Sequence, residues 1–219
     1  MAQPAVLFDV DGTLVDSNYL HVHAWHRAFR KLEVPVECWR IHRAIGMDGS
    51  SLVRDLAGAD HLESAKELHA RFYDELVDLL QPLPGARALL DAVAGLHLQV
   101  VLASSAPDDE LSTLRKVLGR DDIVSVVTDS SDVESAKPDP DIVEVALERA
   151  GVGAERAVFV GDSVWDVRAA ARAGVPCIGL LSGGTSRHEL EAEGAVTVWK
   201  NPQELLERLG DSPIATLGK

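Results

Sequence analysis

The stretch that decides the fold lies at residues 5–14 and reads AVLFDVDGTL. Its first half is a run of apolar residues, which is typical of a strand buried on both faces of a parallel sheet. Asp9 and Asp11 come where this run stops, and Gly12 allows the backbone to turn sharply out of the strand. Ligands collect at the carboxyl ends of parallel strands, so two acids at this place indicate a site. The alternative is a strand-end turn with solvated aspartates, and this fragment alone does not decide between the two.

Further along the chain, short runs rich in Val, Ile and Leu alternate with longer segments of helical periodicity. We expect strands at residues 5–10, 98–103, 123–127, 157–160, 176–180 and 195–198. We expect helices near residues 85–95, 108–118, 140–150, 164–173, 186–193 and 202–209. Strands that alternate with crossover helices form a parallel sheet with both faces covered. The sequence therefore predicts an α/β fold with a doubly wound, Rossmann-like core.

One interval interrupts this alternation, because residues 16–82 contain no strand-like run and show the pattern of three or four amphipathic helices. The alternation resumes after Pro84 and Gly85, which punctuate the chain. We therefore expect residues 1–15 and 83–219 to form the catalytic core, and the interval between them to form an inserted helical cap domain. Four apolar residues are expected to pack in the centre of this cap: Trp25, Phe29, Trp39 and Ile45.

The composition is that of an ordinary globular protein, and the formal net charge is -14. This charge repels nucleic acid and anionic membrane surfaces, so an anionic substrate has to be attracted by a local site. No run approaches the roughly 18 apolar residues of a membrane helix, and the run at residues 5–8 is too short for a signal peptide. Cys38 and Cys177 lie far apart without metal-type spacing, which favours reduced thiols. We expect a cytoplasmic monomer without a nucleic-acid or membrane partner.

Two later segments carry groups that could bind a phosphoryl group. Ser104 and Ser105 follow the second predicted strand and offer a hydroxyl and backbone N–H groups to phosphoryl oxygens. Lys137 lies before Pro138, in a loop stiffened by prolines, where it supplies a single cation. Considered alone, such serines are more often turn or cap residues, and such a lysine is more often a solvated surface residue.

The fourth predicted strand ends in Gly161-Asp162, and Asp166 follows four residues after Asp162. Asp9 and Asp11 project to one side of an extended segment, and like charges held close need a cation or a shared proton. Magnesium takes hard oxygen ligands and keeps several waters, so a few carboxylates and a substrate phosphate suffice to bind it. Helix capping is the alternative role for Asp162 and Asp166. Each segment alone could be a turn or a helix cap. Four strand ends in one chain that all carry groups suited to phosphoryl transfer favour a catalytic site.

The chain resembles the haloacid dehalogenase superfamily in a set of motifs that share its order and spacing: residues 9–14, Ser104, Lys137 and residues 161–166. The resemblance covers nearly the whole chain and is to the branch of phosphoglycolate phosphatases and β-phosphoglucomutases. It implies that Asp9 is a nucleophile that forms an aspartyl-phosphate. It also implies that Asp11 is the general acid for the leaving alcohol and then the base for the attacking water.

The resemblance further implies a set of groups that hold Mg²⁺: Asp9, the backbone carbonyl of Asp11, Asp162 and, through water, Asp166. Ser104, with Ser105 beside it, would bind the transferring phosphoryl group. Lys137 would neutralise charge on that group and on Asp9.

By the same resemblance, the cap opens for the substrate and closes to exclude water. Specificity is then expected on cap residues that face the site, with His21 in the substrate pocket and the turn at residues 46–50 nearby. His21, His23 and His26 do not share one helical face, so no metal site is expected among them.

We expect a magnesium-dependent phosphatase for a small phosphorylated metabolite of the phosphoglycolate or sugar phosphate type. A phosphosugar mutase is the alternative, although mutases of this family carry Glu-Asp where the chain has Gly161-Asp162. A phosphoacceptor signalling module would lack both Asp11 and the large helical insertion, and a catalytically silent binding protein would not need the intact motifs. On the phosphatase hypothesis, five residues converge around one cavity: Asp9, Asp11, Ser104, Lys137 and Asp162.

Overall fold

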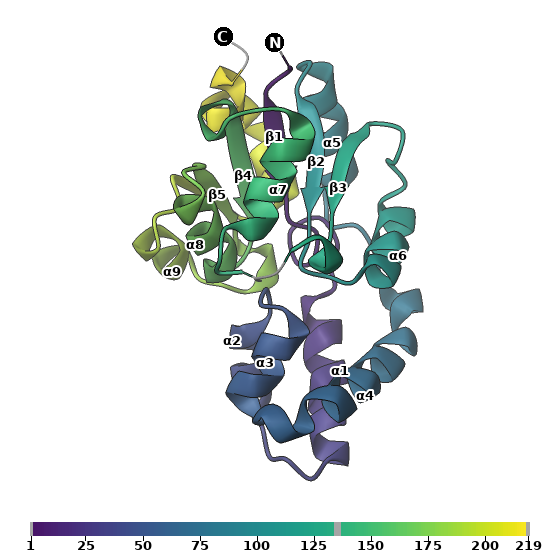
Figure 1. Ribbon diagram of the computed structural model, residues 1–219. Helices are drawn as coiled ribbons and strands as arrows, with labels where there is room; N and C mark the ends of the chain where they lie inside the picture. Colours follow the sequence, from purple (N-terminus) through teal and green to yellow (C-terminus); the bar gives the residue numbers. More distant parts are fainter. Residues whose placement is uncertain (1, 134–136, 218–219) are drawn as a thin grey trace.

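The computed structural model describes residues 2–133 and 137–217, and within these ranges six apolar runs pair in one parallel sheet (Figure 1). The strands are β1 Ala5–Phe8, β2 Gln99–Ala103, β3 Val124–Thr128, β4 Ala157–Gly161, β5 Cys177–Leu180 and β6 Thr197–Trp199. Their order is β3-β2-β1-β4-β5-β6, so β1 lies in the interior between β2 and β4. This order confirms the predicted doubly wound core. It also places the end of β1 where such sheets bind ligands.

The side chains of β1 alternate between two faces of the sheet, and helices cover both faces. Val6 and Phe8 enter one apolar layer, whereas Ala5 and Leu7 enter the other. The first layer is closed by α5 Ala86–Gly95, α6 Asp108–Leu118 and α10 Pro202–Glu207. The second layer is closed by α7 Asp141–Ala150, α8 Val164–Arg172 and α9 Arg187–Ala192. Because both faces are covered, the strands are continuous apolar runs.

The chain between β1 and α5 forms a helical cap beyond one edge of the sheet, drawn in purple and blue in the lower half of Figure 1. Its helices are α1 Asn18–Lys31, α2 Cys38–Ala44, α3 Gly49–Leu56 and α4 Leu62–Asp74. The two long helices α1 and α4 pack against each other, and Trp25 and Phe29 are buried in an apolar core of the cap. An apolar cluster therefore lies within the cap, while Ala24 of α1 and Tyr73 of α4 pack with the first layer of the sheet.

The expectation that Trp39 packs in this core is wrong, because its side chain is 67% exposed. The short helix α2 buries Ile41 and Ala44, which are three residues apart on one face. Trp39 precedes Ile41 by two residues and therefore points to the other side of the helix.

The two chain segments that join cap and core lie side by side. Val15 forms a bridge with Pro82, and the N–H of Asp16 donates to the carbonyl oxygen of Gln81 at 3.0 Å. This pairing lies next to residues 15 and 83, where the predicted cap boundaries fall, and the division into two domains stays a prediction. Two short paired connections allow a rigid-body hinge, and the motion itself stays a prediction.

The remaining helical segments are single 3-10 turns: η1 Ala59–His61, η2 Val77–Leu79, η3 Ser130–Asp132, η4 Ala154–Arg156, η5 Leu181–Gly183, η6 Leu209–Asp211 and η7 Pro213–Thr216. Along the described ranges, every helix is too short or too polar to cross a membrane. Cys38 and Cys177 both carry free thiols, in keeping with the expected reduced state.

The core of the cap yields a paired test of stability. Phe29 is fully buried, so Phe29→Ala should lower the free energy of unfolding by about 3–5 kcal/mol, through lost apolar contacts and a cavity. Trp39→Ala removes a larger but exposed side chain and should change that energy by less than about 0.5 kcal/mol. Urea unfolding followed by circular dichroism measures both variants. Equal losses in the two would contradict the assignment of the cap core.

Candidate active site

The carboxyl ends of the central strands bring predicted site residues to one edge of the sheet. The N–H of Asp9 donates to the carbonyl oxygen of Val160 at 2.9 Å, so Asp9 extends β1 by one residue beside β4. Asp162 follows the last residue of β4 and lies at the same edge. A cavity of about 1030 Å³ lies between this edge and the cap. Its walls include Asp9, Asp11, Ser105, Lys137 and Asp162.

Lys137 is buried and lies between two carboxylates. Its Nζ donates to Asp9 Oδ1 at 2.6 Å and to Asp166 Oδ1 at 2.7 Å. Burial alone would lower the pKa of this amine, but the charges of Asp166 and Asp9 outweigh it and raise the pKa above its ordinary value. Lys137 is therefore an ammonium group that orients Asp9 and neutralises part of its charge.

Asp166 is contacted by protein donors at both carboxylate oxygens. Oδ1 accepts from Lys137, while Oδ2 accepts from the N–H of Ser163 at 3.0 Å and from its hydroxyl at 2.6 Å. Ser163 Oγ in turn accepts from the N–H of Asp166, which forms a capping box at the start of α8. Asp166 thus fixes the position of Lys137, and its role in a metal shell stays a prediction.

Asp162 is held by two residues that the motif analysis did not single out. Thr13 Oγ1 donates to Asp162 Oδ1 at 2.9 Å, and Asn18 Nδ2 donates to Asp162 Oδ2 at 2.9 Å. Thr13 belongs to the acidic strand-end motif, so a signal for it was present in the sequence. Asn18 is the first residue of α1 and has no comparable signal. The first residue of α1 therefore contacts Asp162, the acid that follows β4.

One group of acids at this edge has the chemistry of a cation site. Oxygens of Asp9, Asp162 and Asp166 lie within 4.8 Å of one another. Burial raises the pKa of Asp9 to about 7, although Lys137 opposes the shift. Burial also raises the pKa of Asp162 well above its ordinary value, and the charges of Asp166 and Asp9 add to the effect. Ionising these acids therefore requires further positive charge, and their hard oxygen ligands suit Mg²⁺.

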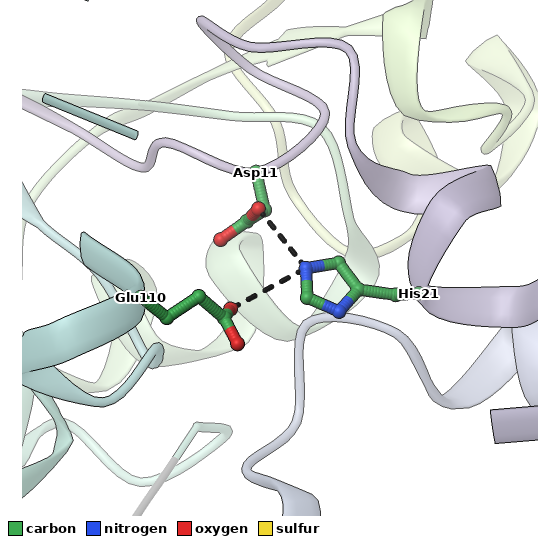
Figure 2. Close-up of side chains that lie close together, drawn as sticks. All are labelled: Asp11, His21 and Glu110. Atoms are coloured by element: carbon green, nitrogen blue, oxygen red, sulfur yellow. Dashed lines mark hydrogen bonds and ion pairs between the residues drawn. The ribbon is translucent and has the colours of Figure 1, made fainter. Parts of the chain in front are cut away.

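Asp11 belongs to a second polar group, shown in Figure 2 with His21 and Glu110. Ser17 Oγ donates to Asp11 Oδ1 at 2.5 Å, and His21 Nε2 lies 3.2 Å from the same oxygen. Burial tends to raise the pKa of Asp11, but the hydrogen bond and charge of His21 outweigh burial and lower that pKa. His21, predicted from the sequence to face the substrate, lines the cavity and contacts Asp11 directly.

The two serines after β2 occupy different positions. Ser104 is fully buried, and its Oγ accepts a hydrogen bond from the N–H of Ala106 at 3.1 Å. Ser105, by contrast, lines the cavity. The sequence motif favoured Ser104 as the main phosphoryl ligand, and the structure places Ser105 nearer to the open space. Phosphoryl binding by either serine stays a prediction.

The chain matches the haloacid dehalogenase-like hydrolase family over residues 4–174. The protein is a haloacid dehalogenase-like hydrolase. This hydrolase is 31% identical over 211 residues to a phosphorylated carbohydrates phosphatase of Thermotoga maritima, which covers 94% of this chain and 97% of the relative. It is 30% identical over 234 residues to a phosphoglycolate phosphatase of Rhodospirillum rubrum, which covers 95% of this chain and 96% of the relative. A crystal structure of a hydrolase from Pseudomonas syringae has 36% identity and a TM-score of 0.91, over 95% of this chain and 99% of that one.

The position of Asp162 in the hydrolase depends on a glycine in η5. A Cβ added at Gly183 would lie 1.6 Å from Asp162 Oδ2, so Gly183→Ala must displace this carboxylate. We expect the variant to bind Mg²⁺ at least about tenfold more weakly, because the loss of contacts that hold a ligand in place lowers metal affinity by about that factor. Titration of Mg²⁺ with thermal melting as the readout measures this. Gly210→Ala is the control, because a Cβ at Gly210 meets open space, and unchanged Mg²⁺ affinity in Gly183→Ala would contradict the assignment.

The raised pKa of Asp9 makes the stability of the metal-free hydrolase depend on pH. An acid whose pKa rises from 3.8 in the unfolded chain to about 7 in the fold destabilises the fold as pH increases through that window. In a chelating buffer at about pH 8, Asp9→Asn should therefore melt at a higher temperature than the wild type. The difference should shrink as the pH falls from about 7 towards 4, and calorimetry at several pH values measures it. A difference that does not vary with pH would contradict the raised pKa.

Proposed function

We propose that this hydrolase is a magnesium-dependent phosphatase that acts on a small phosphorylated metabolite through an aspartyl-phosphate at Asp9. The main support is the contact of the buried Lys137 ammonium with Asp9 at the wall of a cavity that Asp11 and Asp162 also line. A carboxylate held by a cation, with a second acid two residues later, provides both a nucleophile and a proton carrier.

The proposed reaction has two displacements at phosphorus. In the first, a carboxylate oxygen of Asp9 attacks the phosphorus atom, and the bond from phosphorus to the alcohol oxygen breaks while Asp11 donates its proton to that oxygen. In the second, Asp11 accepts a proton from water, the water oxygen attacks phosphorus, and the bond to Asp9 breaks to release phosphate. Asp11 returns to its protonated form, so the cycle is balanced.

The surrounding residues supply charge and orientation. Lys137 neutralises negative charge on Asp9 and on the phosphoryl oxygens, and Ser104 and Ser105 offer donors to those oxygens. Asp9, Asp162 and the backbone carbonyl of Asp11 would hold Mg²⁺, which when bound screens the phosphate from the carboxylates. Asp166 orients Lys137 and could contact the cation through water.

The substrate is proposed to be of the phosphoglycolate or sugar phosphate type, in line with the names of the two relatives. The cavity volume of about 1030 Å³ is at the upper end of the roughly 300–1,000 Å³ common for ligand pockets. It therefore has room for an alcohol the size of a sugar. The phosphosugar mutase predicted as the alternative would release no net phosphate, so one assay separates the two.

We expect the protein to release phosphate from at least one member of a panel of small phosphoesters, with a requirement for Mg²⁺. The panel contains phosphoglycolate, hexose phosphates and nucleoside monophosphates.

Asp9→Asn should lower kcat at least about a thousandfold, because it removes the nucleophile. Asp11→Asn should lower kcat by about 10²–10⁴, the usual contribution of general acid–base catalysis. Colorimetric phosphate detection measures all of them.

Asp55→Asn serves as the matched control, since Asp55 is an exposed residue of α3 that does not line the cavity. It should keep the wild-type rate. Undiminished phosphate release by Asp9→Asn would contradict the aspartyl-phosphate. Isomer conversion without phosphate release would favour the mutase.

A further inference from the structure

Tyr73 presents a buried hydroxyl that the proposed mechanism does not use. The residue lies on α4, is 4% exposed and lines the cavity. Among the described residues, its hydroxyl has no hydrogen-bond partner. Burial raises the pKa of Tyr73, and the nearby charges of Asp11 and Glu110 add to this, so the group remains a protonated donor. A buried donor without a partner costs free energy unless a ligand or water satisfies it.

Glu110 is a second polar group without a role in the mechanism. It lies in the first turn of α6, on the core side of the cavity, and its side chain is largely buried. Figure 2 shows its carboxylate pointing toward His21, with Oε1 at 3.4 Å from His21 Nε2. The same nitrogen contacts Asp11, so Glu110 lies close to the proposed proton carrier. An acid in the first turn of a helix is usually explained by the helix dipole, but this one faces a cavity.

The cap holds His21 and Tyr73 in fixed positions. The rings of His21 and Tyr73 stack with centroids 4.1 Å apart, and Trp25 stacks on His69 at 4.0 Å. His21 Nδ1 lies 3.2 Å from His69 Nε2. Burial and the charge of His21 hold the pKa of His69 well below its ordinary value, so His69 is neutral and accepts from His21 Nδ1–H. This leaves His21 Nε2–H to donate toward Asp11 and Glu110.

We propose that Tyr73 and Glu110 form a hydroxyl-binding subsite beside Asp11, which selects phosphate esters with a hydroxyl on the carbon adjacent to the ester carbon. The proposal rests on the phosphatase function above, because Asp11 protonates the alcohol oxygen of the ester and so defines where that carbon lies. A hydroxyl both donates and accepts, so it can accept from Tyr73 and donate to Glu110 at once.

A carboxylate at the same position would fit this subsite poorly. It can accept from Tyr73, but it has no hydrogen to donate to Glu110, and it would add a second negative charge beside that of Glu110. Sites built to hydrogen-bond a substrate hydroxyl discriminate strongly against analogues that lack it. Within the proposed substrate types, the subsite therefore favours polyol and sugar phosphates over phosphoglycolate.

Three two-carbon esters test this directly, since they differ only at the adjacent carbon: 2-hydroxyethyl phosphate, ethyl phosphate and 2-phosphoglycolate. With wild-type protein and Mg²⁺ at about pH 8, kcat/KM should fall in that order, and the first should exceed the last at least about tenfold. If phosphoglycolate is cleaved as well as or better than 2-hydroxyethyl phosphate, the subsite is overturned and the phosphatase function stands.

Two variants assign the selectivity to its residues, each read as a ratio between esters within one protein. Tyr73→Phe should lower the ratio of 2-hydroxyethyl phosphate to ethyl phosphate about tenfold, because only the first ester uses the hydroxyl contact. Glu110→Gln should raise the ratio of phosphoglycolate to 2-hydroxyethyl phosphate about tenfold, because it removes the repelling charge. Asp108→Asn, in the same turn of α6 but outside the cavity, should leave both ratios unchanged. Ratios that do not move in the first two variants, or that move equally in Asp108→Asn, overturn the proposal.

If none of the three esters is hydrolysed, the phosphatase function is in doubt for this class, and binding still tests the subsite. Calorimetric titration of the esters into Asp9→Asn with Mg²⁺ should then give the same order of affinity. Equal affinities, or tighter binding of phosphoglycolate, would overturn the subsite independently of turnover.

Discussion

The contact on which the rest of the site depends is the buried Lys137 ammonium between Asp9 and Asp166. A charge in this position is tolerated only when it is paired with good geometry, and Lys137 has two such partners. The three side chains come from the loop before α7, the end of β1 and the first turn of α8. Lys137 is therefore paired with both acids only when β1, the loop before α7 and the start of α8 pack in their native positions. The fold and the orientation of the proposed nucleophile are linked by this one interaction.

The same edge of the sheet carries more negative than positive charge near Asp9. Burial and mutual repulsion raise the pKa values of Asp9 and Asp162. A further cation is therefore needed to keep both acids ionised at neutral pH. The whole chain has a net charge of -14, which repels a phosphate ester at long range. Under the proposed function, attraction of such a substrate is therefore local and depends on Lys137 and on a cation that the carboxylates would hold.

Cap and core contribute different parts of the cavity. The core supplies Asp9, Lys137 and Asp162, which under the proposed function act on the phosphoryl group. The cap supplies Asn18, which holds Asp162, and His21, which contacts Asp11. A cap that moved away would release these contacts together, so under the proposed function closure would position both Asp11 and the wall that faces the alcohol. Under the proposed function, the groups for phosphoryl chemistry come from the core, whereas the side chains that face the alcohol come from both cap and core.

The sequence alone determined the strands, their place in a doubly wound sheet and the acids at the strand ends, because these follow from local periodicity and from the shared edge of parallel strands. Only the tertiary structure decided which atoms meet. It directed Ser105 rather than Ser104 to the cavity, paired Asp166 with Lys137, and exposed Trp39. It also placed Glu110, which in the sequence looks like an ordinary first-turn acid, beside His21. The physical reason is that side-chain periodicity is set by neighbours along one helix or strand, whereas contacts between distant segments depend on how those elements pack together.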